Sequence, residues 1–249
     1  MSIFRNFYLG FKFALSYFSI LPVSFNSKDD LSSKEILNFM VLSLPLVGAI
    51  LGIITVLIYL FIENLELYGA VISALIYMIL YGFIHTEAVL DVADAIYASH
   101  SNKDAYKIIK ESTVGAMGVL YAIALVISKV AGITYLLLHN LFIEFIIIII
   151  VSRLSLVILF RIHKFRSIFA TQLKESLNQN HLIIAIISIT ALSIYIGYSA
   201  IIILFSGILL SIFISFWIKN KLSFVNGDVL GATLESVEVI MFLLIAKLI

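Results

Sequence analysis

The sequence predicts an all-α protein: a polytopic bundle of about seven membrane-spanning helices, preceded by an amphipathic helix in the membrane interface. Hydrophobic residues make up 62% of the 249 residues and charged residues only 12%, whereas a soluble domain averages roughly 45 to 50% apolar residues. Several apolar runs reach the roughly 20 residues that one bilayer crossing needs. We therefore expect a single integral membrane domain over residues 1–249 with the lipid bilayer as a partner. The net charge of +1 gives no reason to expect a nucleic-acid partner.

The first element is predicted as a helix that ends at Pro22. Its polar face carries Arg5, Lys12 and Ser16, and its apolar face carries Phe4, Phe7, Tyr8, Phe11, Leu15 and Phe18. This pattern suits a helix that lies in the membrane interface, while an ordinary first span or a helix packed on the bundle stays an alternative. Lys12 interrupts the apolar stretch and no small-x-small cleavage site follows, so we do not expect a removable signal peptide.

The later apolar runs predict the spans in order. After a polar loop, helices are expected over 36–62, 67–90, 114–138 and 142–160. The run 182–218 is too long for one crossing at roughly 1.5 Å per residue, so we expect a break near Gly197 and Ser199. A last span is expected over 229–248.

The positive charges predict an orientation for these spans. With the N-terminus inside, the cytoplasmic segments collect most Lys and Arg residues and the three external connections carry none. Within the proposed spans the basic residues are Lys129 and Arg153. We therefore expect a multi-pass protein of the cell inner membrane whose candidate site faces the cytoplasm.

Three acids end the second predicted span. Glu87, Asp91 and Asp94 are spaced i, i+4 and i+7, so they share one face of a helix. A carboxylate near hydrocarbon costs several kcal/mol unless it is paired, protonated, hydrated or metal-bound. The chain has no cysteine, and oxygen ligands suit a hard cation such as Mg²⁺. We predict these acids to be catalytic and metal-binding, with a solvated helix end as the alternative.

Further candidates lie beside these acids and at the start of the last span. His85 precedes Glu87 by two residues and points away from it, so it is either a donor to substrate or a histidine satisfied between helices. Asp228 and Glu235 fall on one face if the last helix starts early. We predict Asp228 to bind metal and both acids to bind substrate. Capping of that helix is the alternative for Asp228, but it explains neither Glu235 nor Glu238.

Two basic segments are candidates for phosphate binding. The segment after the acids offers two lysines and a hydroxyl, namely Lys107, Lys110 and Ser112. A later loop offers the guanidinium groups of Arg161 and Arg166, each of which can bind two phosphate oxygens. Gly115 and Gly118 would let the backbone or another helix approach closely. The alternative is that the basic residues only set topology and contact lipid headgroups.

Together these groups are typical of a phosphoryl-transfer site, in which a metal and basic side chains offset phosphate charge and a carboxylate takes a hydroxyl proton. A cation transporter is an alternative from another class of protein. A transporter would place such acids near the bilayer midplane, whereas here they lie at the inner end of a span beside a basic loop.

Several motifs resemble cobalamin synthase, the adenosylcobinamide-GDP ribazoletransferase family, in the same order along the chain. The stretch from His85 to Ala95 is similar to the family's His-Leu-Asp-Gly-Leu-Ala-Asp-Thr-Ala-Asp-Gly, with three acids in the acidic places. The other similar segments are Leu44-Pro-Leu-Val-Gly48, Lys110-Glu-Ser-Thr-Val-Gly-Ala-Met-Gly-Val119 and Gly227-Asp-Val-Leu-Gly-Ala-Thr233. The chain departs from the motifs at Glu87, Ala88, Glu111, Thr113 and Asn226, and Thr113 replaces an arginine.

The resemblance implies a membrane transferase that uses Mg²⁺ to join adenosylcobinamide-GDP to α-ribazole or its 5′-phosphate. GMP would be released and the nucleotide loop of vitamin B12 completed. A homo-oligomer and an association with other enzymes of the B12 pathway both stay open. The alternative within enzymes is a CDP-alcohol phosphotransferase, but the chain lacks that family's Asp-Gly-x-x-Ala-Arg run.

Overall fold

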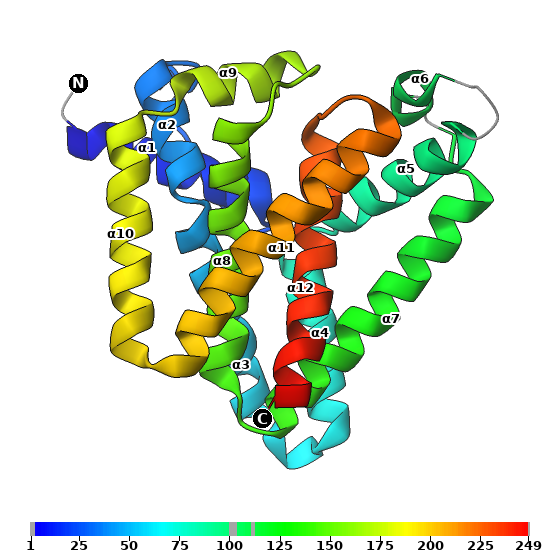
Figure 1. The fold of residues 1–249 in the computed structure, drawn as a ribbon. Helices are drawn as coiled ribbons and strands as arrows, with labels where there is room; N and C mark the ends of the chain where they lie inside the picture. The colour runs from blue at the N-terminus through cyan, green and yellow to red at the C-terminus, as the bar shows by residue number, and fades with distance from the viewer. Residues whose placement is uncertain (1–2, 100–103, 111–112, 249) are drawn as a thin grey trace.

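The long helices of the chain form a bundle that is narrow at one end and broad at the other (Figure 1). A computed structural model describes residues 3–99, 104–110 and 113–248, and in these ranges all regular structure is helical. Six of the described helices are long and apolar enough to cross a membrane, or seven spans if one bent pair counts as a single span. The predicted fold class is therefore confirmed, and the chain is a multi-pass membrane protein.

Helix α1 (Ile3–Phe18) lies at the broad end beside α2 (Lys34–Leu42) (Figure 1). The two helices pack closely at Gly10, where a Cβ atom would lie 2.5 Å from the Cβ of Phe39. Phe4 and Tyr8 project outward and are exposed. An outward aromatic face on a helix at one end of the bundle agrees with a position in the membrane interface.

The predicted span over 36–62 is wrong in one respect, because two helices share it. Helix α2 ends at Leu42 and α3 (Leu44–Phe61) begins after Ser43. Pro45 stands in the first turn of α3, where its missing N–H is tolerated, but it cannot continue the hydrogen bonds of α2. The apolar run therefore continues through a change of helix.

The predicted span over 67–90 is also broken. Helix α4 (Leu67–Leu80) and helix α5 (Ile84–Ser99) meet at an angle of 79°. Gly82 has φ of +65° and its N–H donates to Ile79, while the N–H of Phe83 donates to Met78; these two bonds form a Schellman helix end. The carbonyl of Leu80 accepts a 2.9 Å hydrogen bond from the N–H of Ile20. The bend redirects the acid-bearing helix along the broad end of the bundle.

The remaining spans agree with the predicted ones. They are α7 (Ala116–Leu138), α8 (Phe142–Ile162), α10 (Gln179–Ile196), α11 (Tyr198–Leu222) and α12 (Gly227–Leu248). The break between α10 and α11 falls at Gly197, whose φ of +131° suits glycine. Short helices lie in the connections, namely η1 (Glu63–Leu65), α6 (Ala105–Lys110) and α9 (Ile168–Ser176). Helices α8 and α12 are the most buried spans, and α10 is the least buried.

Candidate functional site

A cavity of about 660 Å³ lies where segments from both halves of the chain meet. Its wall is built from the end of α1, the starts of α5 and α12, helix α6, the end of α8 and the link into α9. A largely apolar pocket with a few polar groups is the usual form of a small-molecule site. Four of the predicted site residues line it: His85, Lys110, Arg166 and Asp228.

Aromatic rings make a large part of this wall. Tyr17 packs 5.7 Å from Phe169, centroid to centroid, and 4.8 Å from Phe18. Phe18 in turn stacks on the ring of His85 at 5.9 Å. The end of α1 thus joins α9 and α5 in one aromatic surface, which offers a stacking face for a planar ring.

His85 is nearly enclosed at the inner wall of the cavity. Its ring lies between Phe18 and Tyr81, each at 5.9 Å, and only 6% of the residue is exposed. Gly231 of α12 lies against it, since a Cβ atom at Gly231 would come within 3.3 Å of the His85 Nδ1. His85 therefore lines the cavity and is also packed between helices. This position is compatible with both predicted roles, a donor to substrate and a histidine satisfied between helices.

Asp228 lies in the first turn of α12 and lines the cavity. The amide of Asn226 donates to Asp228 Oδ2 at 2.6 Å, and Asn226 Oδ1 accepts from the backbone N–H of Val229 at 3.1 Å. Asn226 is therefore the helix cap. The alternative in which Asp228 caps α12 is wrong, and its carboxylate is held toward the cavity instead.

The acids of α5 come close to Asp228 without lining the cavity themselves. Glu87 is exposed and Asp91 is half-buried, and the charge of Asp91 is within electrostatic range of both Asp228 and Glu87. In the part of the chain that the structure describes, no Lys or Arg nitrogen lies within 4 Å of these three carboxylates. Helices α5 and α12 therefore bring unpaired negative charge together, as the sequence predicts.

Asp94 has partners that the sequence did not predict. Its two carboxylate oxygens accept hydrogen bonds from the backbone N–H groups of Gly115 and Gly118, at 2.6 and 2.7 Å. These donors lie at the start of α7, where backbone N–H groups have no partner within the helix and attract negative charge. A Cβ atom at Gly118 would lie 2.5 Å from Asp94 Oδ2 and 2.6 Å from the carbonyl of Leu90. The close approach expected at the two glycines is confirmed, and the approaching group is Asp94.

The basic candidates separate into two groups. Lys110 and Arg166 line the cavity, and both are exposed. Lys107 is exposed on α6 outside the lining, and Arg161 donates to Gln179 Oε1 at 3.5 Å on the side of α10. Ser112 lies outside the described residues.

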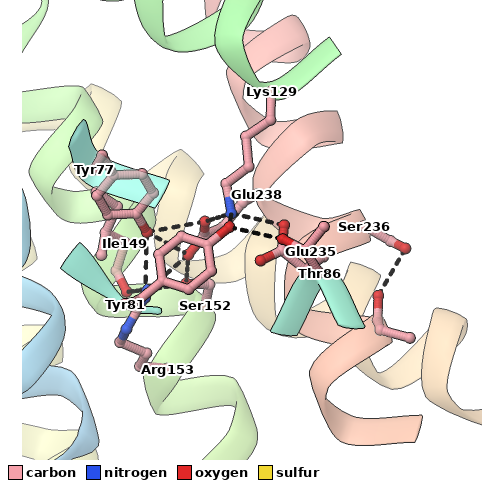
Figure 2. Close-up of polar contacts among 11 residues, drawn as sticks. Tyr77, Tyr81, Thr86, Lys129, Ile149, Ser152, Arg153, Glu235, Ser236 and Glu238 are labelled. Atoms are coloured by element: carbon pink, nitrogen blue, oxygen red, sulfur yellow. Dashed lines mark hydrogen bonds and ion pairs between the residues drawn. The ribbon is translucent and has the colours of Figure 1, made fainter. Parts of the chain in front are cut away.

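A second polar group lies inside the bundle, where α4, α7, α8 and α12 meet (Figure 2). Lys129 forms 2.7 Å ion pairs with both Glu235 and Glu238, and Arg153 forms one of 2.6 Å with Glu238. These side chains have at most 3% of their surface exposed. We call these four residues the buried ion cluster. Its formal charge is zero, which is the condition for keeping ionised groups inside a bundle.

Hydroxyl groups complete the buried ion cluster. Ser152 donates to Glu238 at 2.8 Å, and the Tyr77 hydroxyl donates to the same carboxylate at 3.0 Å (Figure 2). The Tyr81 hydroxyl accepts from Lys129 at 3.3 Å. Glu235 belongs to this cluster rather than to the cavity lining, because Lys129 needs a counter-ion inside the bundle. Glu235 therefore does not line the cavity, and its contact with substrate stays a prediction.

The sequence contained a signal for this cluster. Lys129 and Arg153 are basic residues inside predicted spans, and charges there are rare unless they have a partner. Spacing along the chain could not identify the partners, because Glu238 lies 85 residues after Arg153 and Glu235 lies 106 residues after Lys129.

The donor chemistry of Asp228 and the nearby acids of α5 fits Mg²⁺. Glu87, Asp91 and Asp228 offer only oxygen ligands and have no Lys or Arg partner within the part of the chain that the structure describes. Mg²⁺ commonly binds through one or two carboxylates together with water and substrate phosphate. Among the described residues, no three Asp, Glu or His side chains are gathered closely enough to hold a metal by themselves. The residues thus suit a metal that arrives with a phosphate ligand.

Comparison with known proteins agrees with the order of the motifs. Residues 10–246 match the family model described as cobalamin-5-phosphate synthase. Similar proteins named adenosylcobinamide-GDP ribazoletransferase occur in Clostridium perfringens strain SM101, with 27% identity over 94% of this chain and 96% of the relative. Others are from Brevibacillus brevis, with 26% identity over 95% and 97%, and from Clostridium tetani, with 30% identity over 82% and 84%. No solved structure matches the chain significantly.

Proposed function

Since the chain belongs to the cobalamin-5-phosphate synthase family and is a membrane transferase of cobalamin biosynthesis, we propose that it joins adenosylcobinamide-GDP to α-ribazole or its 5′-phosphate with release of GMP. The observation that carries this proposal is one cavity that combines the Asp228 carboxylate, two basic side chains and aromatic rings, with Glu87 and Asp91 within electrostatic range of Asp228. A diphosphate that links two large groups needs all three kinds of contact.

We assign the basic wall to the diphosphate. Arg166 and Lys110 both line the cavity, and a guanidinium can bind two phosphate oxygens at once. The aromatic surface formed by Tyr17, Phe18 and Phe169 is assigned to a planar base of one substrate. Lys107 and Arg161 lie outside the cavity lining. We therefore assign them the alternative role predicted for the basic residues, which is to set the topology of the protein in the membrane.

The reaction is a transfer of a phosphoryl group between two oxygens. The ribose hydroxyl of the acceptor attacks the phosphorus linked to cobinamide, its P–O bond forms, and the P–O bond to GMP breaks with the electron pair leaving on GMP. The hydroxyl proton passes to a carboxylate among Glu87, Asp91 and Asp228. Arg166 and Lys110 offset charge on the phosphoryl oxygens.

Glu87, Asp91 and Asp228 are the residues that would hold Mg²⁺. When bound, the metal would neutralise phosphate charge and stabilise the leaving phosphate. Asp94, whose two oxygens are occupied by the backbone of α7, is assigned the task of holding α5 against α7. It thereby sets where Asp91 and Glu87 lie.

The cavity is proposed to face the cytoplasm, with the protein in the cell inner membrane. The broad end carries the segments that are rich in Lys and Arg, including α6, the link after α8, and the end of α11 (Figure 1). Positive charge of this kind marks the cytoplasmic side of a membrane protein. Both substrates are water-soluble molecules that would enter from that side.

The test is GMP release by the purified, detergent-solubilised protein given adenosylcobinamide-GDP and α-ribazole. We expect turnover with Mg²⁺, none after chelation by EDTA, and recovery when Mg²⁺ is restored. Asp91→Asn and Asp228→Asn should each lower kcat at least ~100-fold, as expected for loss of a group that acts on the transition state.

Glu63→Gln is the matched control, because it removes an exposed carboxylate from η1, at the narrow end of the bundle (Figure 1). It should leave turnover within about two-fold of the wild type. Folded wild-type protein that releases no GMP from these substrates would contradict the proposed function, and normal turnover by Asp91→Asn would remove Asp91 from the site.

A further inference from the structure

Two basic side chains of the cavity meet on one aromatic ring, that of Tyr106 in α6. The guanidinium carbon of Arg166 lies 3.7 Å from the centroid of this ring, and the Lys110 Nζ lies 4.7 Å from it. Both distances are within the range of a cation–π interaction. All three residues line the cavity.

Tyr106 is itself fixed by neighbouring segments. Its ring forms a T-shaped pair with that of Phe224, with centroids 5.1 Å apart and an angle of 90° between the planes, and its backbone N–H donates to the side chain of Asp104 at 3.0 Å. The backbone N–H of Arg166 donates to the carbonyl of Val225 at 2.9 Å. The ring therefore stands where α6, the link into α9 and the approach to α12 come together.

The two cations have no negative partner among the described residues. Within residues 3–99, 104–110 and 113–248, no carboxylate oxygen lies within 4 Å of Lys110 or Arg166. Two positive groups on one ring repel each other, and a ring can only partly compensate that repulsion. A dianionic group bound by both side chains would offset the repulsion and accept hydrogen bonds from both, and a diphosphate carries such charge.

From this geometry we infer that Tyr106 is a positioning residue, whose ring holds Arg166 and Lys110 together as a two-point clamp for a diphosphate. The inference rests on the proposed function for the identity of the natural ligand, but the clamp itself requires only a diphosphate anion. The ring acts through the two basic side chains and makes no contact with the reacting atoms.

The ring and the hydroxyl of Tyr106 have separable roles in this inference. A cation–π interaction depends on the face of the ring, which phenylalanine retains and leucine lacks. Tyr106→Phe should therefore bind diphosphate within about two-fold of the wild type. Tyr106→Leu should bind it about ten-fold more weakly, which corresponds to the loss of two exposed cation–π contacts.

The experiment measures the binding of inorganic diphosphate to the full-length protein in detergent by calorimetric titration, with the unfolding midpoint of every variant recorded. Tyr106→Met, which keeps a long side chain but no ring, replaces Tyr106→Leu if the latter does not yield folded protein. Phe216→Leu is the matched control, because Lys219 lies 5.4 Å from the Phe216 ring outside the cavity. This control should bind diphosphate as the wild type does.

A second comparison separates positioning from general damage to the fold. In a background of Arg166→Gln with Lys110→Gln, adding Tyr106→Leu should cause no further loss of diphosphate binding, because the ring then has nothing to position. A further loss of several-fold in that background would show that Tyr106 acts in another way and would overturn the inference. Unchanged diphosphate binding by folded Tyr106→Leu would overturn it as well.

The outcome is distinguishable from that of the proposed function. Diphosphate binding that depends on the Tyr106 ring, in a protein that releases no GMP, would support the clamp and contradict the proposed reaction. Normal GMP release with a KM for adenosylcobinamide-GDP that is unchanged in Tyr106→Leu would contradict the clamp and leave the reaction in place. Support for both requires a KM raised about ten-fold with a smaller change in kcat.

Discussion

The buried ion cluster gives the sharpest test of how the bundle is held together. Lys129→Met removes the positive charge that pairs with Glu235 and Glu238, and it keeps a long apolar side chain of similar size. Glu238 retains Arg153 at 2.6 Å, but Glu235 loses its ion pair inside the bundle. The cluster then carries a net charge of −1 among side chains that have almost no exposed surface.

The expected loss can be worked from the distances. At an effective dielectric constant of ~20, opposite charges 2.7 Å apart attract each other by about 6 kcal/mol. Desolvation of the charges cancels much of this attraction, but removing one partner leaves an uncompensated charge and commonly costs ~3 to 5 kcal/mol. Glu235→Gln should cost less, because a glutamine still accepts a hydrogen bond from Lys129, and Lys129 keeps Glu238.

The assay compares unfolding midpoints in one detergent at one heating rate. Lys129→Met should lower the midpoint by roughly 6 to 20 °C, and the pair Lys129→Met with Glu235→Gln should recover most of this loss because the cluster is again neutral. A Lys129→Met protein as stable as the wild type would refute the reasoning. So would a double variant no more stable than Lys129→Met alone, since it would show that charge balance does not set the cost.

Two other features lead to further predictions. Gly118→Ala places a methyl group 2.5 Å from Asp94 Oδ2 and should destabilise the protein by ~1 to 3 kcal/mol. The control Gly227→Ala, with no atom within 4 Å of the added Cβ, should change the unfolding midpoint little. Equal unfolding midpoints of the two variants would show that the contact between α5 and α7 can relax. Burial lowers the pKa of His163, so the stability from its neutral form should be complete above pH ~6.5 and decrease as the pH falls below that value. His163→Phe should show a weaker decrease between pH 7 and 5, and an unchanged pH profile would exclude His163 as its source.

The positions of most spans followed from local composition. A run of about 20 apolar residues must satisfy its backbone hydrogen bonds internally, so it becomes a helix wherever it sits in the bundle. This is why α7, α8 and α12 agree with the predicted ranges, and why Gly197 could be identified as the break in a run that was too long. The helix breaks inside two predicted spans were not visible in this way, because the apolar character continues through Ser43 and Gly82.

The candidate site was predicted in part. The acid at position 228 and the basic residues 110 and 166 were identified by residue type and spacing, and the fold brings them to one cavity with His85. Tyr106 and the aromatic end of α1 were not identified as part of it. Nothing in the order of residues indicates that α1, α6 and α12 meet, because their contacts join segments about 90 to 210 residues apart.

Spacing along a helix determines which side chains share a face, and this is a local property of the backbone. Which neighbour that face meets depends on how bent and straight helices pack, and packing is a property of the whole chain. Asp94 and Glu235 show the difference, since each has the predicted position on its helix, yet one carboxylate meets the start of α7 and the other meets Lys129. Tertiary structure decides the partner because a buried polar group takes the nearest group of opposite charge or hydrogen-bonding character, whatever its distance in sequence.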